Sequence, residues 1–342
     1  MIVGGTPLLL GGGALPEYLA VSHDGGSGVS AYPWSSAGFG TKFANPSPGL
    51  PGDGRGVAFA PAGDAIACGH GNTPFITAYR FSAAGFGSKF TNPATLPPAI
   101  CKSVAFSSAG NALAAAHNNS PFISAYPWSS AGFGTKFANP GTVVIDSGAG
   151  CAFGLSAALA LAHSGAPRIT VYLWSTSGFG GDFGNPGTAI PGNALSVTFT
   201  ANANAIAVGH GGSPFISLYP WSSASGFGTK FADPATLPAS SSDAVAFSPA
   251  GDAFACVQNV TPFVFVYPWS TSGFGTKFAD PATPPPDIVI GLSFSRKSNA
   301  LACAHRLTPF LTVYNWSTAG FGTKFANPAT TPAEFCRAVA FY

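Results

Sequence analysis

A small set of charged residues lies outside the repeating pattern of this 342-residue sequence. Seven ten-residue stretches connect the repeats, at 47–56, 94–103, 141–150, 187–196, 235–244, 282–291 and 329–338, and the charged residues fall in six of them. The candidate binding residues in these stretches are Asp53, Arg55, Lys102, Asp146, Asp243, Asp287, Glu334 and Arg337. Varied loops on a regular frame are where repeat proteins form binding sites, so we expect a partner or ligand to contact these side chains. The alternative is that the stretches are solvated loops whose sequences have drifted.

Four of these candidates are acids, namely Asp146, Asp243, Asp287 and Glu334. Two converging carboxyl groups could act as acid and base on a glycosidic bond, so a glycan-active enzyme is one hypothesis. The sequence contains neither a sialidase-type Asp box nor a nucleophile elbow. We therefore expect no enzymatic activity and no cofactor, and we keep the glycan-active enzyme as the least favoured alternative.

The histidines form a second candidate set, because all six occupy one repeat position: His23, His70, His117, His163, His210 and His305. Gln258 takes this position in the sixth unit. A metal ion needs ligands that converge to about 2.0–2.1 Å, whereas one histidine per unit spreads the imidazoles around the molecule. We therefore predict no metal site. Each histidine is expected to end a strand and to hydrogen-bond the turn that follows.

The elements that carry these residues repeat at intervals of about 47 residues, marked by Trp34, Phe81, Trp128, Trp174, Trp221, Trp269 and Trp316. One unit, 103–140, reads as four short strands: SVAFS, ALAAAH, FISAYPW and TKFANP. Turns rich in Gly, Asn and Ser separate them, including Gly-Phe-Gly hairpin turns. Seven such units predict an all-β fold, a single seven-bladed β-propeller with four-stranded blades.

The ends of the repeat pattern predict how the ring closes. The first unit begins at its second strand, 18–23, and has no Val-Ala-Phe segment before it. That segment appears at 339–341, after the seventh unit. We therefore expect strand 339–341 to complete the blade of 18–46 and to leave no open sheet edge. The propeller spans 18–342, and residues 1–17 form an apolar N-terminal arm that either covers the ring opening or docks on a second subunit.

The composition excludes several classes of function. Charged residues make up 8% of the chain and the formal net charge is +2, so the sequence lacks the basic stripe of a nucleic-acid-binding protein. No run of about 18 apolar residues is present, and a membrane span is not expected. Three of the six cysteines share one repeat position, so we interpret the cysteines as small buried hydrophobic residues in the reduced state.

The first hairpin, VAFSPAGDAFAC at 245–256, resembles that of WD40-type repeats. The closer resemblance is to phage and bacterial propeller repeats of the type LAVAH-x-x-SPF-I-x-x-Y, which here read LAAAH at 113–117 and SPFI at 120–123. This resemblance implies a phage virion component: a decoration, baseplate or tail-fibre protein located in the virion, with other virion proteins or surface glycans as partners. The alternative is a cytoplasmic interaction scaffold of WD40 type.

Overall fold

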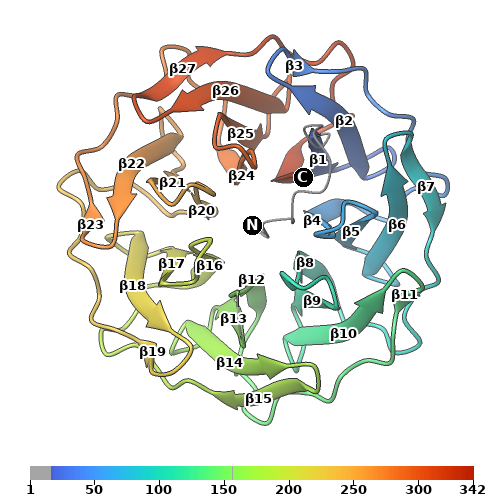
Figure 1. The fold of residues 1–342 in the computed structure, drawn as a ribbon, viewed down its shortest axis with the longest axis horizontal. Coiled ribbons are helices and arrows are strands. Elements are labelled where there is room, and N and C mark those ends of the chain that lie inside the picture. Colours follow the sequence, from blue (N-terminus) through green and yellow to red (C-terminus); the bar gives the residue numbers. More distant parts are fainter. Residues whose placement is uncertain (1–16, 156) are drawn as a thin grey trace, which may run out of the picture.

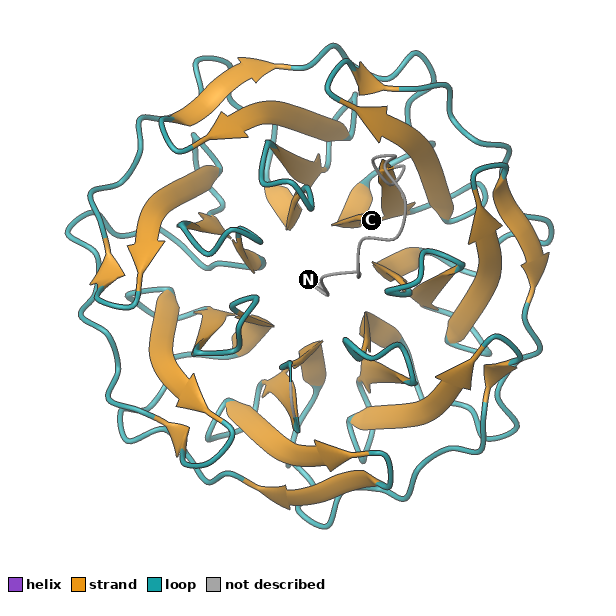
Figure 2. Ribbon diagram, in the orientation of Figure 1, coloured by secondary structure: helices purple, strands orange, loops and turns teal. Residues whose placement is uncertain are grey.

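Residues 17–155 and 157–342 are described by a computed structural model, which is a ring of seven four-stranded antiparallel sheets (Figure 1). Figure 2 shows strands and loops throughout these residues. No helix of the described residues is long and apolar enough to cross a membrane. The fold class predicted from the repeats is confirmed.

Each sheet has the same order of strands from the axis outward. The innermost strands are β28 (Cys336–Phe341), β4 (Gly54–Phe59), β8 (Cys101–Phe106), β12 (Gly148–Phe153), β16 (Ala194–Phe199), β20 (Val245–Phe247) and β24 (Val289–Phe294). The second strands are β1 (Glu17–His23), β5 (Ala65–His70), β9 (Ala112–His117), β13 (Ala158–His163), β17 (Ala205–His210), β21 (Ala253–Val257) and β25 (Ala300–His305). The third strands are β2 (Val29–Ser35), β6 (Ile76–Ser82), β10 (Ile123–Ser129), β14 (Ile169–Ser175), β18 (Ile216–Ser222), β22 (Val264–Ser270) and β26 (Leu311–Ser317). The outer strands are β3 (Gly38–Phe39), β7 (Gly85–Lys89), β11 (Gly132–Phe133), β15 (Gly178–Asp182), β19 (Gly226–Phe227), β23 (Gly273–Phe274) and β27 (Gly320–Lys324).

The ring closes in the predicted way, because β28 pairs with β1 in the first blade. Leu19 lies opposite Phe341 and Val21 opposite Val339. The Phe341 amide also donates to Ser293 Oγ of the seventh blade at 3.2 Å, which ties the closing strand to its neighbour. The predicted arm over 1–17 lies outside the described residues, apart from Glu17, which begins β1.

The outer strands differ from the prediction, which assigned the fourth strand to TKFANP. They begin earlier, at the glycine of Gly-Phe-Gly, and four of them contain only two residues. These four blades carry a proline in the third strand: Pro33, Pro127, Pro220 and Pro268. Proline lacks the N–H that a ladder needs, so strand pairing stops there. The other three blades have Arg80, Leu173 and Asn315 at this position, and their outer strands extend to five residues.

The blades pack against each other through aromatic clusters, illustrated by Trp128. The centre of its ring lies 5.1 Å from the ring centre of Phe133 in the same blade. It lies 5.0 Å from the ring centre of Phe90, which follows the outer strand of the preceding blade. Gly132 has φ +99°, and a Cβ there would lie 2.8 Å from Phe90. Glycine is therefore required by both the backbone and the packing. The predicted hairpin turn lies just before this glycine, and Gly132 and Phe133 belong to the outer strand.

Candidate functional site

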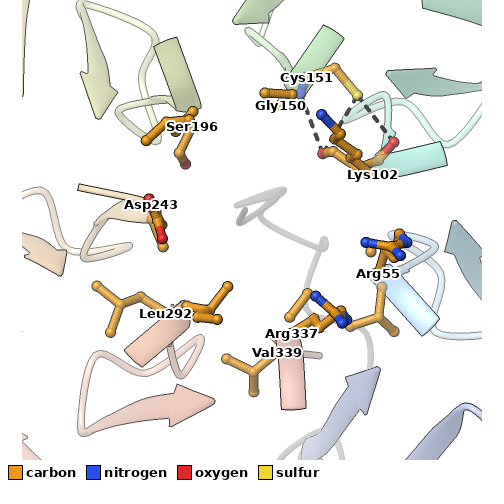
Figure 3. Close-up of a pocket in the computed structure, with 18 of the residues that line it drawn as sticks. Arg55, Lys102, Gly150, Cys151, Ser196, Asp243, Leu292, Arg337 and Val339 are labelled. Carbon is orange, nitrogen blue, oxygen red and sulfur yellow. Dashed lines mark hydrogen bonds between the residues drawn. The ribbon is translucent and has the colours of Figure 1, made fainter. Parts of the chain in front are cut away.

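A cavity of about 320 Å³ opens around the axis of the ring, lined by the innermost strands (Figure 3). Its mouth is formed by one repeat position, two residues before the Val of each Val-Ala-Phe-like segment. We call these residues the axial ring: Arg55, Lys102, Ala149, Leu195, Asp243, Ile290 and Arg337. The next layer holds only Gly, Ser and Ala, so the inner strands approach one another closely. A Cβ on Gly56 would lie 2.9 Å from the Ser103 Cα.

A β-bulge presents the axial residue in six of the seven blades. In the second blade Gly54 lies opposite His70 and Gly56 opposite Gly69, so Arg55 is the extra residue between two paired neighbours. The same shift occurs at the other axial residues except Asp243: Lys102, Ala149, Leu195, Ile290 and Arg337. Bulges redirect side chains and are frequent beside functional sites, and here they direct one side chain per blade toward the axis.

Three cations follow one another around the axial ring, and we call Arg337, Arg55 and Lys102 the basic arc. Their environments differ. Arg337 donates to both carboxylate oxygens of Asp24, and Lys102 Nζ donates to Ser147 Oγ at 3.1 Å. Burial, together with the charge of Arg55, lowers the pKa of Lys102. Arg55 Nε is buried and has no hydrogen-bond partner among the described residues. Arg55 is therefore the cation of the arc with the most unsatisfied bonding capacity.

Asp243 is the single acid of the axial ring, and Figure 3 shows it across the cavity from Arg55 and Lys102. In ring order it stands between Leu195 and Ile290. Burial raises its pKa above the ordinary value of 3.8, and the charge of Arg306 in the next blade opposes this shift. A carboxyl group whose pKa is raised in a cleft with nearby cations is suited to proton transfer.

The structure brings together half of the binding residues predicted from sequence. Arg55, Lys102, Asp243 and Arg337 line the cavity, whereas Asp53, Asp146, Asp287 and Glu334 do not. Asp146 is exposed and accepts a hydrogen bond from the Ser147 amide at 2.6 Å. No pair of acids therefore converges on the cavity in the manner of the predicted glycan-active site.

Sequence reasoning missed Asp24, the partner of Arg337, because it lies in the turn after His23 and outside the connecting stretches. The variation in residue type at the position after each histidine would have indicated it. This position reads Asp24, Gly71, Asn118, Ser164, Gly211, Asn259 and Arg306, and so varies as the axial ring does.

The histidines are structural residues of the blades, which we call frame residues, but the side-chain partner common to all six is a third-strand hydroxyl and not, as predicted, the turn that follows. The Nε2 atom of each histidine lies 2.9–3.1 Å from a Ser or Thr hydroxyl seven residues later, in the third strand of the same blade. In addition, His23 and His117 contact turn carbonyls through Nδ1. Burial lowers the pKa of His117 to about 4. Among the described residues no group of three or more His, Cys, Asp or Glu could hold a metal ion.

The tyrosine that recurs in each blade attaches that blade to the loop leading into it. Tyr126 donates to the Thr95 carbonyl at 2.9 Å, and the other six tyrosines make the equivalent bond. All six cysteines are buried and unpaired, as predicted.

No family model matches this sequence, and no curated protein matches it either. Solved structures of bacterial propellers do match in fold. A periplasmic gluconolactonase from Pseudomonas aeruginosa is similar over 95% of this chain and 99% of its own, with TM-score 0.69 and 13% identity. A Bacteroides fragilis protein described provisionally as a 6-phosphogluconolactonase is similar over 96% and 98%, with TM-score 0.72 and 12% identity. A Lactobacillus plantarum protein covers 96% and 100%, with TM-score 0.72 and 13% identity.

These similarities support a seven-bladed propeller and correct the role expected from the repeat resemblance. The neighbours are bacterial proteins, two of them named for lactone hydrolysis, and none points to a phage repeat type. The predictions of a non-catalytic virion component, located in the virion, and of no enzymatic activity were wrong on this comparison. The physical reason for the error is that the repeat resemblance rests on residues that fix the fold, and these are shared by propellers of different roles.

Proposed function

We propose that this chain hydrolyses the lactone of a small anionic sugar within the axial cavity. The observation that carries the proposal is the placement of one carboxyl group, Asp243, across a cavity from Arg55 and Lys102, two of the three cations of the basic arc. The cavity volume of about 320 Å³ suits a molecule of this size. The names of the neighbours of similar fold add support, since two of them refer to lactones of gluconic acid.

The chemistry needs one proton acceptor and one source of positive charge. Asp243 takes a proton from a water molecule as the water oxygen attacks the lactone carbonyl carbon. The basic arc stabilises the negative charge that develops on the carbonyl oxygen. The carbon–oxygen bond of the ring then breaks, and the ring oxygen leaves with the proton that Asp243 had accepted. Water and lactone give one hydroxy acid, and Asp243 returns to its starting state.

The basic arc also favours an anionic substrate. Asp24 offsets the charge of Arg337, and the charge of Asp146 acts on Lys102, so Arg55 is the least compensated cation of the arc. A phosphate or carboxylate on the sugar would be held by Arg55, whose Nε has no partner among the described residues.

The test is lactone hydrolysis followed in a pH-stat, with glucono-δ-lactone and its 6-phosphate as probes and the spontaneous rate subtracted. Asp243→Asn is expected to lower kcat by about 10²- to 10⁴-fold. Arg55→Gln is expected to raise KM for the phosphorylated probe by about 10-fold and to change KM for the neutral probe less. Asp287→Asn, a matched acid that does not line the cavity, serves as the control. A wild-type rate equal to the spontaneous rate with both probes would overturn the proposal.

A further inference from the structure

The sixth blade departs from the repeat at several positions at once. Gln258 replaces the frame histidine, and Phe265 replaces the Ser or Thr hydroxyl that this histidine would contact. Lys277 Nζ lies 4.4 Å from the centre of the Phe265 ring. A cation–π contact of Phe265 therefore stands where the other blades have the histidine–hydroxyl hydrogen bond. This blade also holds Asp243.

The inner strand of this blade lacks the bulge that presents the axial residue elsewhere. Strand β20 begins at Val245, and its ladder pairs only Val245, Ala246 and Phe247 with β21. The connecting stretch has the same length as in the other units, with 11 residues from Pro234 to Val245. The difference is therefore one of conformation, and Asp243 lies in a loop instead of within a strand.

Side-chain hydrogen bonds attach this loop to the turn that follows β21, in addition to a backbone bond from the Ser242 amide to the His210 carbonyl at 3.2 Å. The Ala239 amide donates to Gln258 Oε1 at 2.8 Å. The Asn259 amide donates to Ser240 Oγ at 2.7 Å, and Asn259 Nδ2 donates to Ser241 Oγ at 2.8 Å. In the fifth blade the equivalent amide, of Gly211, donates to the Asn193 backbone carbonyl at 3.0 Å.

We infer that Gln258, Asn259 and the hydroxyl groups of Ser240 and Ser241 are positioning residues that fix Asp243 at the cavity, in place of the bulge used by the other blades. In the sixth blade the loss of both members of the histidine–hydroxyl pair accompanies this contact, in which the Gln258 side-chain carbonyl accepts the Ala239 amide. The inference rests on the proposed function, in which Asp243 is the proton acceptor.

The first experiment removes the loop contacts and leaves the blade core intact. The double variant Ser240→Ala/Ser241→Ala is expected to lower kcat about 10- to 100-fold, because small displacements of a catalytic group have effects of this size. KM and the melting temperature should change little. The acid limb of the pH–rate profile should also shift, because Asp243 would sit differently relative to Arg306, to Arg337 and to Arg55 and Lys102 across the cavity. Ser240→Thr/Ser241→Thr keeps the hydroxyl groups and should restore the wild-type values.

The second experiment exchanges the two kinds of blade. Gln258→His/Phe265→Ser restores the frame pair in the sixth blade and is expected to lower kcat and shift the acid limb without loss of stability. The reverse exchange in the fifth blade, His210→Gln/Ser217→Phe, should lower stability and leave the pH profile unchanged, because its axial residue is Leu195. Unchanged kcat and acid limb in both sixth-blade variants would overturn the inference.

A third measurement separates this inference from the proposed function. If the wild-type chain hydrolyses neither lactone, the Asp243 carboxyl can be titrated by ¹³C NMR of protein labelled at aspartate, with Asp243→Asn to assign its signal. A changed titration of Asp243 in Ser240→Ala/Ser241→Ala would support the positioning role while the proposed function fails. An unchanged titration would overturn the positioning role.

Discussion

Arg337 and Asp24 form a two-point ion pair at the mouth of the axial cavity, with Nε to Oδ1 at 2.6 Å and Nη2 to Oδ2 at 2.7 Å. Their side chains are 24% and 18% exposed, so the pair is largely shielded from water. Bidentate geometry of this kind is the strongest form of the arginine–carboxylate contact. The three cations of the basic arc are consequently unequal, since Arg337 has a fixed counter-charge.

Asp24→Ala should therefore change both stability and anion binding. The free energy of unfolding is expected to fall by about 1–3 kcal/mol, because a partly buried guanidinium loses its partner. Inorganic phosphate should bind several-fold more tightly, since a third cation becomes available in the cavity. Calorimetric titration with phosphate and urea unfolding measure the two effects. Asp53→Ala, at an exposed acid, is the control and should alter neither; equal behaviour of the two variants would contradict the prediction.

Acid should unfold this protein through its frame histidines. Burial lowers the pKa of His70, His117, His163, His210 and His305 to about 4, from an ordinary value of 6.5. A histidine that is harder to protonate in the folded chain than in the unfolded chain stabilises the fold fully above pH 6.5. This contribution, about 3 kcal/mol for each residue, is lost as the pH falls from 6.5 to 4.

Urea unfolding at pH 7.5 and pH 5 checks this prediction. We expect the free energy of unfolding to drop steeply between these values and unfolding to take up several protons per molecule. His117→Gln copies the residue of the sixth blade and should reduce the proton uptake by about one. Equal stability at the two pH values would show that the histidines are not buried in the neutral form.

The fold was predictable because the frame residues recur at fixed spacings, whereas the residues of the connecting stretches between them vary. The spacing of His117 and Tyr126, found again in nearly every unit, defined the second and third strands. The Val-Ala-Phe segment at 339–341 defined the closure, since each blade needs one such strand. The start of the outer strands was misplaced because Gly-Phe was assigned to the turn, and their length was missed because it depends on a third-strand proline, an effect that appears only when two strands are paired.

The site was only half predictable, for a physical reason. Arg55 and Asp53 lie two residues apart in one connecting stretch, yet only Arg55 lines the cavity. The bulge decides which of them faces the axis, and a bulge is a property of strand pairing that residue type does not reveal. The contact of Gln258 could not be found from residue types either, because its hydrogen-bond partner at Ala239 is a backbone amide.

The six cysteines should be inert in the folded protein. All are buried, and burial raises the pKa of the Cys151 thiol to about 12. The thiolate is the reactive form, so neither accessibility nor ionisation favours reaction. At pH 8 we expect no reaction of the native protein with a disulfide reagent such as DTNB and reaction of six thiols after unfolding in urea. Rapid reaction of any thiol in the native protein would contradict the burial.

The closing strand should control the stability of the whole ring. Val339 is 3% exposed and lies opposite Val21, so Val339→Asp places an unpaired carboxylate in an apolar layer. The expected cost is at least about 4 kcal/mol. Ala338→Ser on the same strand is the matched control, because Ser103 and Ser196 occupy the equivalent position, and it should change stability by less than about 0.5 kcal/mol. Each blade shares aromatic contacts with the next, so tryptophan fluorescence and far-UV circular dichroism of Val339→Asp should follow one common transition at lower denaturant concentration. Two separate transitions would mean that the first blade can open while the other six remain folded.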